Sequence, residues 1–177
     1  MVESPKGPIR GKQKKSDGET YTPIFDPDQY DAHKSAVAII MGHFFLRYLN
    51  LLYREFEGDL VLPIVLGEIA HHNIIRFHSG KGGSIEVRER ALNSPEWMEN
   101  LEPTNAFSIS QATGIPRETV RRKIGKLEKK GWIVKNDQGE VFMSDTVSEH
   151  FTNNLNKRIL TELLVTSKRI KELLASD

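Results

Sequence analysis

The spacing of apolar residues predicts a protein built mainly from helices. Apolar side chains recur every three or four positions over residues 32–56 and again over residues 145–174, which is the pattern of an amphipathic helix. A shorter apolar stripe follows Asp59, which we expect to be an N-cap, with Pro63 in the first helical turn. Over residues 105–143 the pattern gives two short helices and then two short strands. The expected fold is mainly α with one small β-hairpin.

The two long helices carry more apolar surface than one small domain needs. The first is apolar around most of its circumference, so more than one surface must cover it. Arg47 lies inside its apolar stretch, and a charge at mid-membrane costs about 2.5–3.5 kcal/mol, so we favour burial in protein over a membrane span. The last helix would extend about 45 Å. Either the core or a second subunit must cover the first helix. We expect part of the last helix to pack against a second subunit, although it can also fold back across its own domain.

Residues 105–130 predict two helices joined by a tight turn. Ser108 is the expected N-cap of the first helix, and Gln111 can complete a capping box with it. Gly114 is expected to end this helix, and Pro116 to open the next, which should run to Lys130. Two helices joined by so short a turn cross steeply, as in a helix-turn-helix unit.

The second of these helices has a narrow apolar side and a basic outer side. Val120, Ile124 and Leu127 are expected to pack on the first helix. The opposite side carries Glu118, Thr119, Arg121, Arg122, Gly125, Lys126 and Lys129. A helix with such an outer surface fits the major groove of DNA, which is about 12 Å wide.

A β-hairpin is expected directly after this helix. Strands over 132–135 and 140–143 flank the turn sequence Asn136-Asp137-Gln138-Gly139, and residues 105–107 are a candidate third strand. The residues expected at the tip, placed to contact phosphate or the minor groove, are Lys135, Asn136 and Gln138.

The distribution of charge is more informative than its total. The chain carries 25 basic and 24 acidic residues, yet residues 106–135 hold eight basic residues against Glu118 and Glu128, a net charge of +6. Such clustering is typical of proteins that bind polyanions, although a solvated lysine-rich helix gives the same charge. Cysteine is absent, which excludes disulfides and cysteine-held metals, and no apolar secretory segment follows Met1. We therefore expect a cytoplasmic protein.

The order of these elements resembles the winged helix-turn-helix of bacterial transcriptional regulators of the MarR, GntR and IclR types. The resemblance rests on the sequence SISQATGIPRETVRR and on LEKKGW, which begin at Ser108 and Leu127, and it covers about 40 of the 177 residues. The second helix reads DNA in those families, which implies this role for Arg117, Glu118, Thr119, Arg121 and Arg122. Ser108, Lys126, Lys135, Asn136 and Gln138 complete the expected DNA-binding set.

These expectations divide the chain into four segments. Residues 1–30 form a disordered arm, which either touches DNA or is merely solvated. Residues 31–58 form the first long helix, for dimerisation or the core. Residues 59–144 form the winged helix-turn-helix, and residues 145–177 form a C-terminal helix for dimerisation.

The predicted function is that of a homodimeric, sequence-specific DNA-binding transcriptional regulator that is not an enzyme and uses no cofactor or metal. A small apolar effector can enter near the aromatic residues Phe44, Phe45, Tyr48 and Tyr53. Three alternatives remain: a winged helix that docks proteins, one that binds RNA, and a metal-dependent enzyme that uses Glu68 and His71. The glycine-rich loop over 79–84 lacks the spacing of a phosphate-binding loop.

Overall fold

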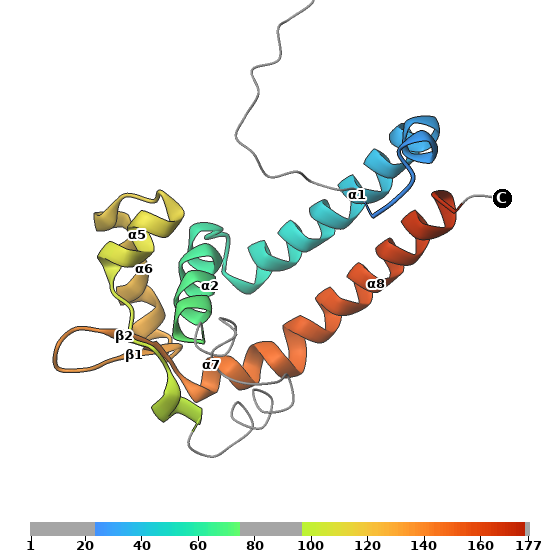
Figure 1. Ribbon diagram of the computed structural model, residues 1–177. Coiled ribbons are helices and arrows are strands. Elements are labelled where there is room, and N and C mark those ends of the chain that lie inside the picture. The colour runs from blue at the N-terminus through green and yellow to red at the C-terminus, as the bar shows by residue number, and fades with distance from the viewer. Residues whose placement is uncertain (1–23, 75–96, 176–177) are drawn as a thin grey trace, which may run out of the picture.

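The computed structural model describes residues 24–74 and 97–175. Two long helices extend in the same direction from a group of short elements, which we call the head (Figure 1). In chain order the elements are α1 (Pro27–Glu55), α2 (Val61–Asn73), the 3-10 turn η1 (Trp97–Asn100), α5 (Ala106–Thr113), α6 (Arg117–Lys129), β1 (Ile133–Lys135), β2 (Val141–Met143), α7 (Asp145–His150), the π-helical turn η2 (Phe151–Leu155) and α8 (Asn156–Leu173). The prediction of a mainly helical chain with one small antiparallel hairpin is confirmed.

The head is organised around an apolar core shared by α2, α5, α6 and the hairpin. These three helices pack on one another, and the hairpin packs on α2 and α6. The core residues are Phe56, Leu62, Val65, Leu66, Ile69, Leu101, Ile109, Val120, Ile124, Leu127, Ile133, Val141, Met143 and Val147. They come from almost every element of the head, so each short element is held by its neighbours rather than by its own helix or strand propensity.

The hairpin pairs β1 with β2 so that Ile133 lies opposite Met143 and Lys135 lies opposite Val141. The expected third strand over residues 105–107 is wrong. A single bridge forms one residue earlier, where Thr104 and Val141 exchange two backbone hydrogen bonds of 3.3 and 2.8 Å. Residues 105–107 are instead the N-cap and first turn of α5, because the Asn105 side chain accepts from two backbone N–H groups there.

The first long helix begins earlier than predicted, whereas the last begins at Asp145, where it was expected. Helix α1 starts at Pro27, five residues earlier than expected, because Asp26 caps it by accepting from the Asp28 N–H at 2.9 Å. Residues 27–30 therefore belong to a helix and not to a disordered arm, while residues 1–23 of that arm lie outside the described residues. The last helix is capped by Ser144 and passes through η2 into α8.

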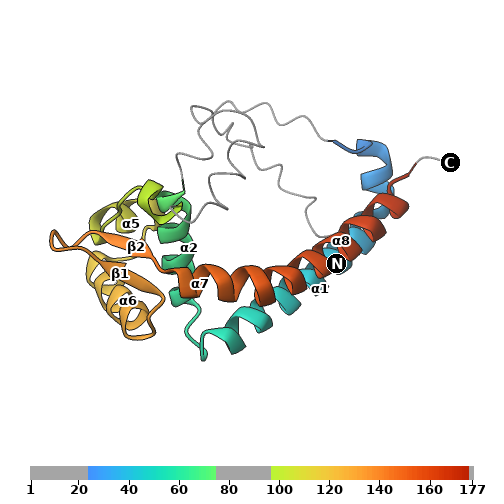
Figure 2. The same ribbon diagram turned by 90° about the horizontal axis from the view of Figure 1, so that it is seen from below.

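Helices α1 and α8 lie side by side and run in opposite directions, α1 toward the head and α8 away from it (Figures 1 and 2). An ion pair of 2.8 Å between Arg47 and Glu162 joins them. The last helix thus folds back along the first helix of its own chain, which was one of the two alternatives.

This pairing leaves much of the apolar surface of both helices open. We use the term apolar surface for the exposed residues Ile39, Met41, Phe45, Leu46, Leu49 and Tyr53 of α1 and Leu160, Leu163, Leu164 and Val165 of α8. An 18-residue window of α1 has a mean hydropathy of 1.4 and is 6% buried, so α1 has the length and composition of a membrane-crossing helix. Core helices of soluble proteins meet the same test.

Candidate nucleic-acid interface

The turn between α5 and α6 is fixed by glycine and by side-chain hydrogen bonds to the backbone. Gly114 ends α5 with φ of 70°, in the left-handed region that favours glycine. The Ser110 hydroxyl donates to the Ile115 carbonyl at 2.8 Å, and the Thr113 hydroxyl accepts from the Ile115 N–H at 3.3 Å. The predicted N-cap of α5, Ser108, is wrong: its own N–H donates to Asn105 at 3.1 Å, and the half-buried Ser108 lies in the first turn.

The inner side of α6 is the one that its sequence predicts. Val120 and Leu127 are fully buried and Ile124 is 4% exposed, all within the head core. The burial of these three side chains determines which side of α6 faces the core. The opposite side must consequently face solvent.

The arginines in the first half of α6 project from this outer side. Arg117, Arg121 and Arg122 are all exposed. The Arg117 guanidinium lies 6.0 Å from the centroid of the Phe107 ring, over a residue of α5 that is itself exposed. Arg121 lies 3.8 Å from Glu118, and both side chains are more than half exposed, so this ion pair is weak and easily exchanged for another anion.

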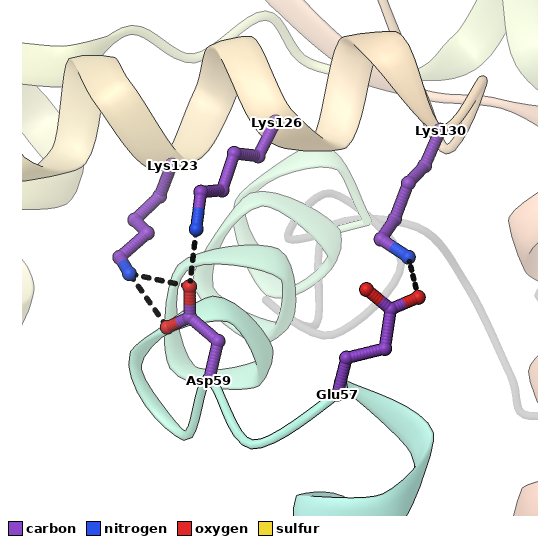
Figure 3. A network of polar contacts seen from close by, with 5 residues as sticks. All are labelled: Glu57, Asp59, Lys123, Lys126 and Lys130. Atoms are coloured by element: carbon purple, nitrogen blue, oxygen red, sulfur yellow. Dashed lines mark hydrogen bonds and ion pairs between the residues drawn. The ribbon is translucent and has the colours of Figure 1, made fainter.

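Two lysines of α6, and a third that follows the helix directly, are held by acidic residues from the loop between α1 and α2 (Figure 3). Lys129 is exposed. Asp59 accepts from the Lys123 ammonium at 2.6 Å and from the Lys126 ammonium at 3.0 Å. Glu57 accepts from Lys130 just beyond the end of α6 at 2.7 Å. The side chains of Lys123 and Asp59 are 10% and 17% exposed, whereas Glu57 is 76% exposed.

These contacts shift the acid–base equilibria of the two carboxylates. Burial raises the pKa of Asp59, but hydrogen bonds from Lys123 and Lys126 outweigh it, so the pKa is lowered overall. The hydrogen bond from Lys130 lowers the pKa of Glu57. Both carboxylates are therefore ionised at neutral pH and offset part of the positive charge of α6.

One sequence prediction about this region is wrong, and one predicted DNA-binding residue has a partner that the sequence did not indicate. Asp59 is not the N-cap of α2, which begins after Leu60 without a side-chain cap. Lys126, expected to contact a nucleic-acid backbone, is already paired with Asp59, although its side chain remains 54% exposed. The pattern of the sequence did not reveal either contact, because the partners lie more than sixty residues apart.

The hairpin tip offers fewer free groups than its sequence suggests. Lys135 is paired with Glu128 of α6. The Asn136 side chain accepts from the N–H groups of Gln138 and Glu140 at 3.1 and 2.9 Å, so it shapes the turn instead of projecting from it. Gln138 is exposed at the tip.

One buried residue that sequence reasoning missed joins α2 to the hairpin. Asn73 is fully buried; its side chain donates to the Glu102 and Val141 carbonyls at 2.7 and 3.2 Å and accepts from the Met143 N–H at 2.8 Å. The signal available in the sequence was an asparagine among the apolar residues of α2. A polar side chain on the buried side of a helix needs a hydrogen-bond partner for each of its polar atoms.

The predicted DNA-binding residues therefore fall into three groups. Exposed groups remain at the start of α6 and at the hairpin tip; these are Arg117, Glu118, Arg121, Arg122 and Gln138. Lys126, Lys135 and Asn136 make intramolecular contacts, and Ser108 and Thr119 are half-buried. The basic character of the interface is thus concentrated in the first half of α6.

The residues of the alternative metal site do not gather into a ligand set. Within residues 24–74 and 97–175, no group of three histidine or acidic side chains lies close enough to hold a metal ion. Glu68 and His71 both lie on α2. The glycine-rich loop over 79–84 lies outside the described residues.

Comparisons with protein-family models, with curated proteins and with solved structures found no match to this chain.

Proposed function

We propose that this chain is a cytoplasmic, winged helix-turn-helix transcriptional regulator that binds specific DNA sequences through α6. The observation that supports this most is the two-sided character of α6. Val120, Ile124 and Leu127 anchor one side in the core, while the exposed side presents arginines at its amino-terminal half. This half of a recognition helix is the part that contacts base edges in helix-turn-helix proteins.

The ion pairs within the chain reduce the number of basic side chains on α6 that are free to contact DNA. Asp59 and Glu57 hold Lys123, Lys126 and Lys130, so we assign the base contacts to Arg117, Arg121 and Arg122. The exposed Lys129 is left for the phosphate backbone. The planar guanidinium of arginine presents a rigid fork of donors that matches guanine edges and phosphates, whereas lysine presents a single flexible ammonium. The hairpin lies next to α6, where Gln138 at its tip contacts the backbone or minor groove.

We infer that two chains associate through the apolar surface of α1 and α8. That surface is made of ten exposed large apolar residues on two helices that pack against each other, and soluble monomers rarely leave large apolar areas exposed. A two-fold dimer would present two copies of α6 to half-sites about 34 Å apart and favour a pseudo-palindromic sequence.

The DNA-binding proposal is tested by selecting bound duplexes from a random pool and then titrating the selected site. Replacing Arg121 and Arg122 together with alanine should abolish retardation of that duplex, with no change in melting temperature, because both side chains are exposed. The matched control replaces Lys168 and Arg169, two adjacent exposed cations of α8, and should bind as the wild type does. Retained binding by the Arg121/Arg122 variant would reject α6 as the recognition helix.

Salt dependence and mass measurement complete the test. For the wild type, the logarithm of the affinity should fall linearly with the logarithm of salt concentration, as phosphate contacts require. Light scattering should give a dimer, and Leu46→Glu together with Leu164→Glu should give a folded monomer, since both residues are about 60% exposed. A wild-type monomer, or a chain that sediments with membranes, would reject the dimer.

A further inference from the structure

The start of α5 carries an exposed aromatic side chain. Phe107 is the second residue of α5, and it is 54% exposed. Ile109, two positions later, is the residue of this helix that is buried in the head core. The packing of the core therefore does not account for a phenylalanine at position 107.

The Phe107 ring lies beside a cation of the candidate DNA interface. The Arg117 guanidinium carbon is 6.0 Å from the ring centroid, at the outer limit for a cation–π contact. Arg121 has an acidic neighbour in Glu118, but Arg117 forms no ion pair with any residue in 24–74 or 97–175. An exposed arginine without an acidic partner samples many rotamers. Contact with the ring is what restricts the Arg117 side chain.

Both side chains of this pair are attached to backbone that is held in place. The Asn105 side chain caps α5 by accepting from the Phe107 N–H at 2.9 Å. Arg117 is the first residue of α6, directly after the turn that Gly114 and the Ser110 hydroxyl stabilise. The fold therefore sets the separation of the two backbones, and the contact depends only on the rotamers of two side chains.

We propose that Phe107 is a positioning residue that holds Arg117 for contact with one guanine of the DNA site. The inference rests on the proposed function, in which the first residues of α6 lie against base edges. An arginine guanidinium matches the O6 and N7 atoms of guanine. A guanidinium that the ring already restricts loses less conformational freedom on binding, and it turns less readily to a neighbouring phosphate.

A direct contact between Phe107 and DNA is the alternative role. Phenylalanine contacts the methyl group of thymine in some protein–DNA interfaces. The position of the ring beside the Arg117 guanidinium in the free protein favours a role through Arg117. The two roles differ in whether the effect of Phe107 depends on Arg117, so a double-mutant cycle separates them.

The test measures the affinity of the full chain for a duplex selected from a random pool. Phe107→Leu keeps an apolar side chain but removes the ring, and it should weaken binding about two- to fivefold, the range of an exposed cation–π contact. Phe107→Tyr keeps a ring and should bind as the wild type does. In the Arg117→Gln background, Phe107→Leu should have no further effect. The matched control Ile64→Ala removes a side chain of similar exposure, 52%, from α2 and should leave the affinity unchanged.

Two further measurements connect the effect to Arg117. Replacing each guanine in turn with 7-deazaguanine removes the N7 acceptor, and one of these replacements should weaken binding by the wild type but not by Arg117→Gln. Phe107→Leu should be less sensitive than the wild type to that same replacement. In the free protein, the ring current of Phe107 should displace the NMR resonances of the Arg117 side chain, and Phe107→Leu should remove this displacement.

Four outcomes would overturn the proposal. Wild-type affinity in Phe107→Leu would remove the role of the ring. An equal loss from Phe107→Leu in the wild-type and Arg117→Gln backgrounds would show direct contact with DNA instead. Arg117 resonances that are unchanged in Phe107→Leu would exclude the contact without any use of DNA. Failure of the wild type to select a duplex would reject the proposed function together with this inference, whereas the other three outcomes reject the inference alone.

Discussion

The contact between Asp59 and Lys123 gives the sharpest prediction about the stability of the head. Both side chains are more than four-fifths buried, and the two oxygens of Asp59 each lie 2.6 Å from the Lys123 ammonium. Asp59→Asn keeps the size of the side chain but removes its charge. The Lys123 ammonium, fixed on α6 between core residues, then lies in a largely buried site without a counter-charge.

The expected cost follows from this burial. Removing one partner of a fully buried ion pair costs about 3–5 kcal/mol. The amide introduced by Asp59→Asn would still offer one oxygen acceptor, and a lysine chain can extend toward water, so we expect a loss of about 2–3 kcal/mol. For a chain of this length the melting temperature should fall by about 5–10 °C. Glu57→Gln is the matched control: it breaks the exposed pair with Lys130 and should leave the melting temperature unchanged.

Urea unfolding monitored by circular dichroism measures the effect. A second substitution, Lys123→Met, removes the uncompensated charge, so the double variant Asp59→Asn/Lys123→Met should return to within about 1 kcal/mol of the wild type. The reasoning fails if Asp59→Asn lowers the free energy of unfolding by less than about 1 kcal/mol. It also fails if adding Lys123→Met restores none of the lost free energy.

Three further predictions concern pH, a buried amide and two glycines. Because the pKa of Asp59 is lowered from its ordinary value of 3.8, its contribution to stability is present above that value and lost as the pH falls through the lowered one; acid titrations of unfolding should show a steeper loss for the wild type than for Asp59→Asn. Asn73→Leu should cost about 3 kcal/mol in urea unfolding, because it leaves the buried Met143 N–H without its acceptor; a near-neutral result would mean that water replaces the side chain. Gly114→Ala should lower the free energy of unfolding by about 1 kcal/mol, because Gly114 has a positive φ. Gly125→Ala within α6 should raise it by about 1 kcal/mol, because a Cβ there meets nothing within 4 Å. The same effect for both substitutions would contradict the assigned backbone geometry.

Local patterns in the sequence were sufficient to predict the secondary structure of the head. The apolar spacing of Val120, Ile124 and Leu127 correctly identified the buried side of α6, and Gly114 correctly marked the end of α5. Both signals act over a few residues, which is the range on which helix periodicity and glycine conformation depend. The errors in this region concerned helix starts: α5 begins after Asn105, where a strand was a candidate, and α2 begins after Leu60 without the expected cap from Asp59.

Contacts between distant residues were not predictable in this way. Nothing in the neighbourhood of Asp59 or of Lys123 indicates that they meet, and Lys135 was assigned to the hairpin tip without its partner Glu128. Ionic partners depend on how helices pack, and a count of basic residues overstates the charge that remains available to a ligand. The net charge of +6 over residues 106–135 is accordingly an upper limit for the candidate interface.

The position of the Asp59 contact links the two halves of the molecule. Phe56, which follows α1 directly, is buried in the head core, and Asp59 three residues later holds α6 through Lys123. Between them, Gly58 has a positive φ of 84°, which glycine adopts without strain, and a Cβ at this position would lie 3.2 Å from the Tyr53 ring of α1. A core aromatic residue and a buried ion pair, on either side of this turn, thus fix the direction of α1 relative to α6. In the proposed dimer, the packing of the long helices would therefore set the separation of the two α6 helices, and with it the spacing of the DNA half-sites.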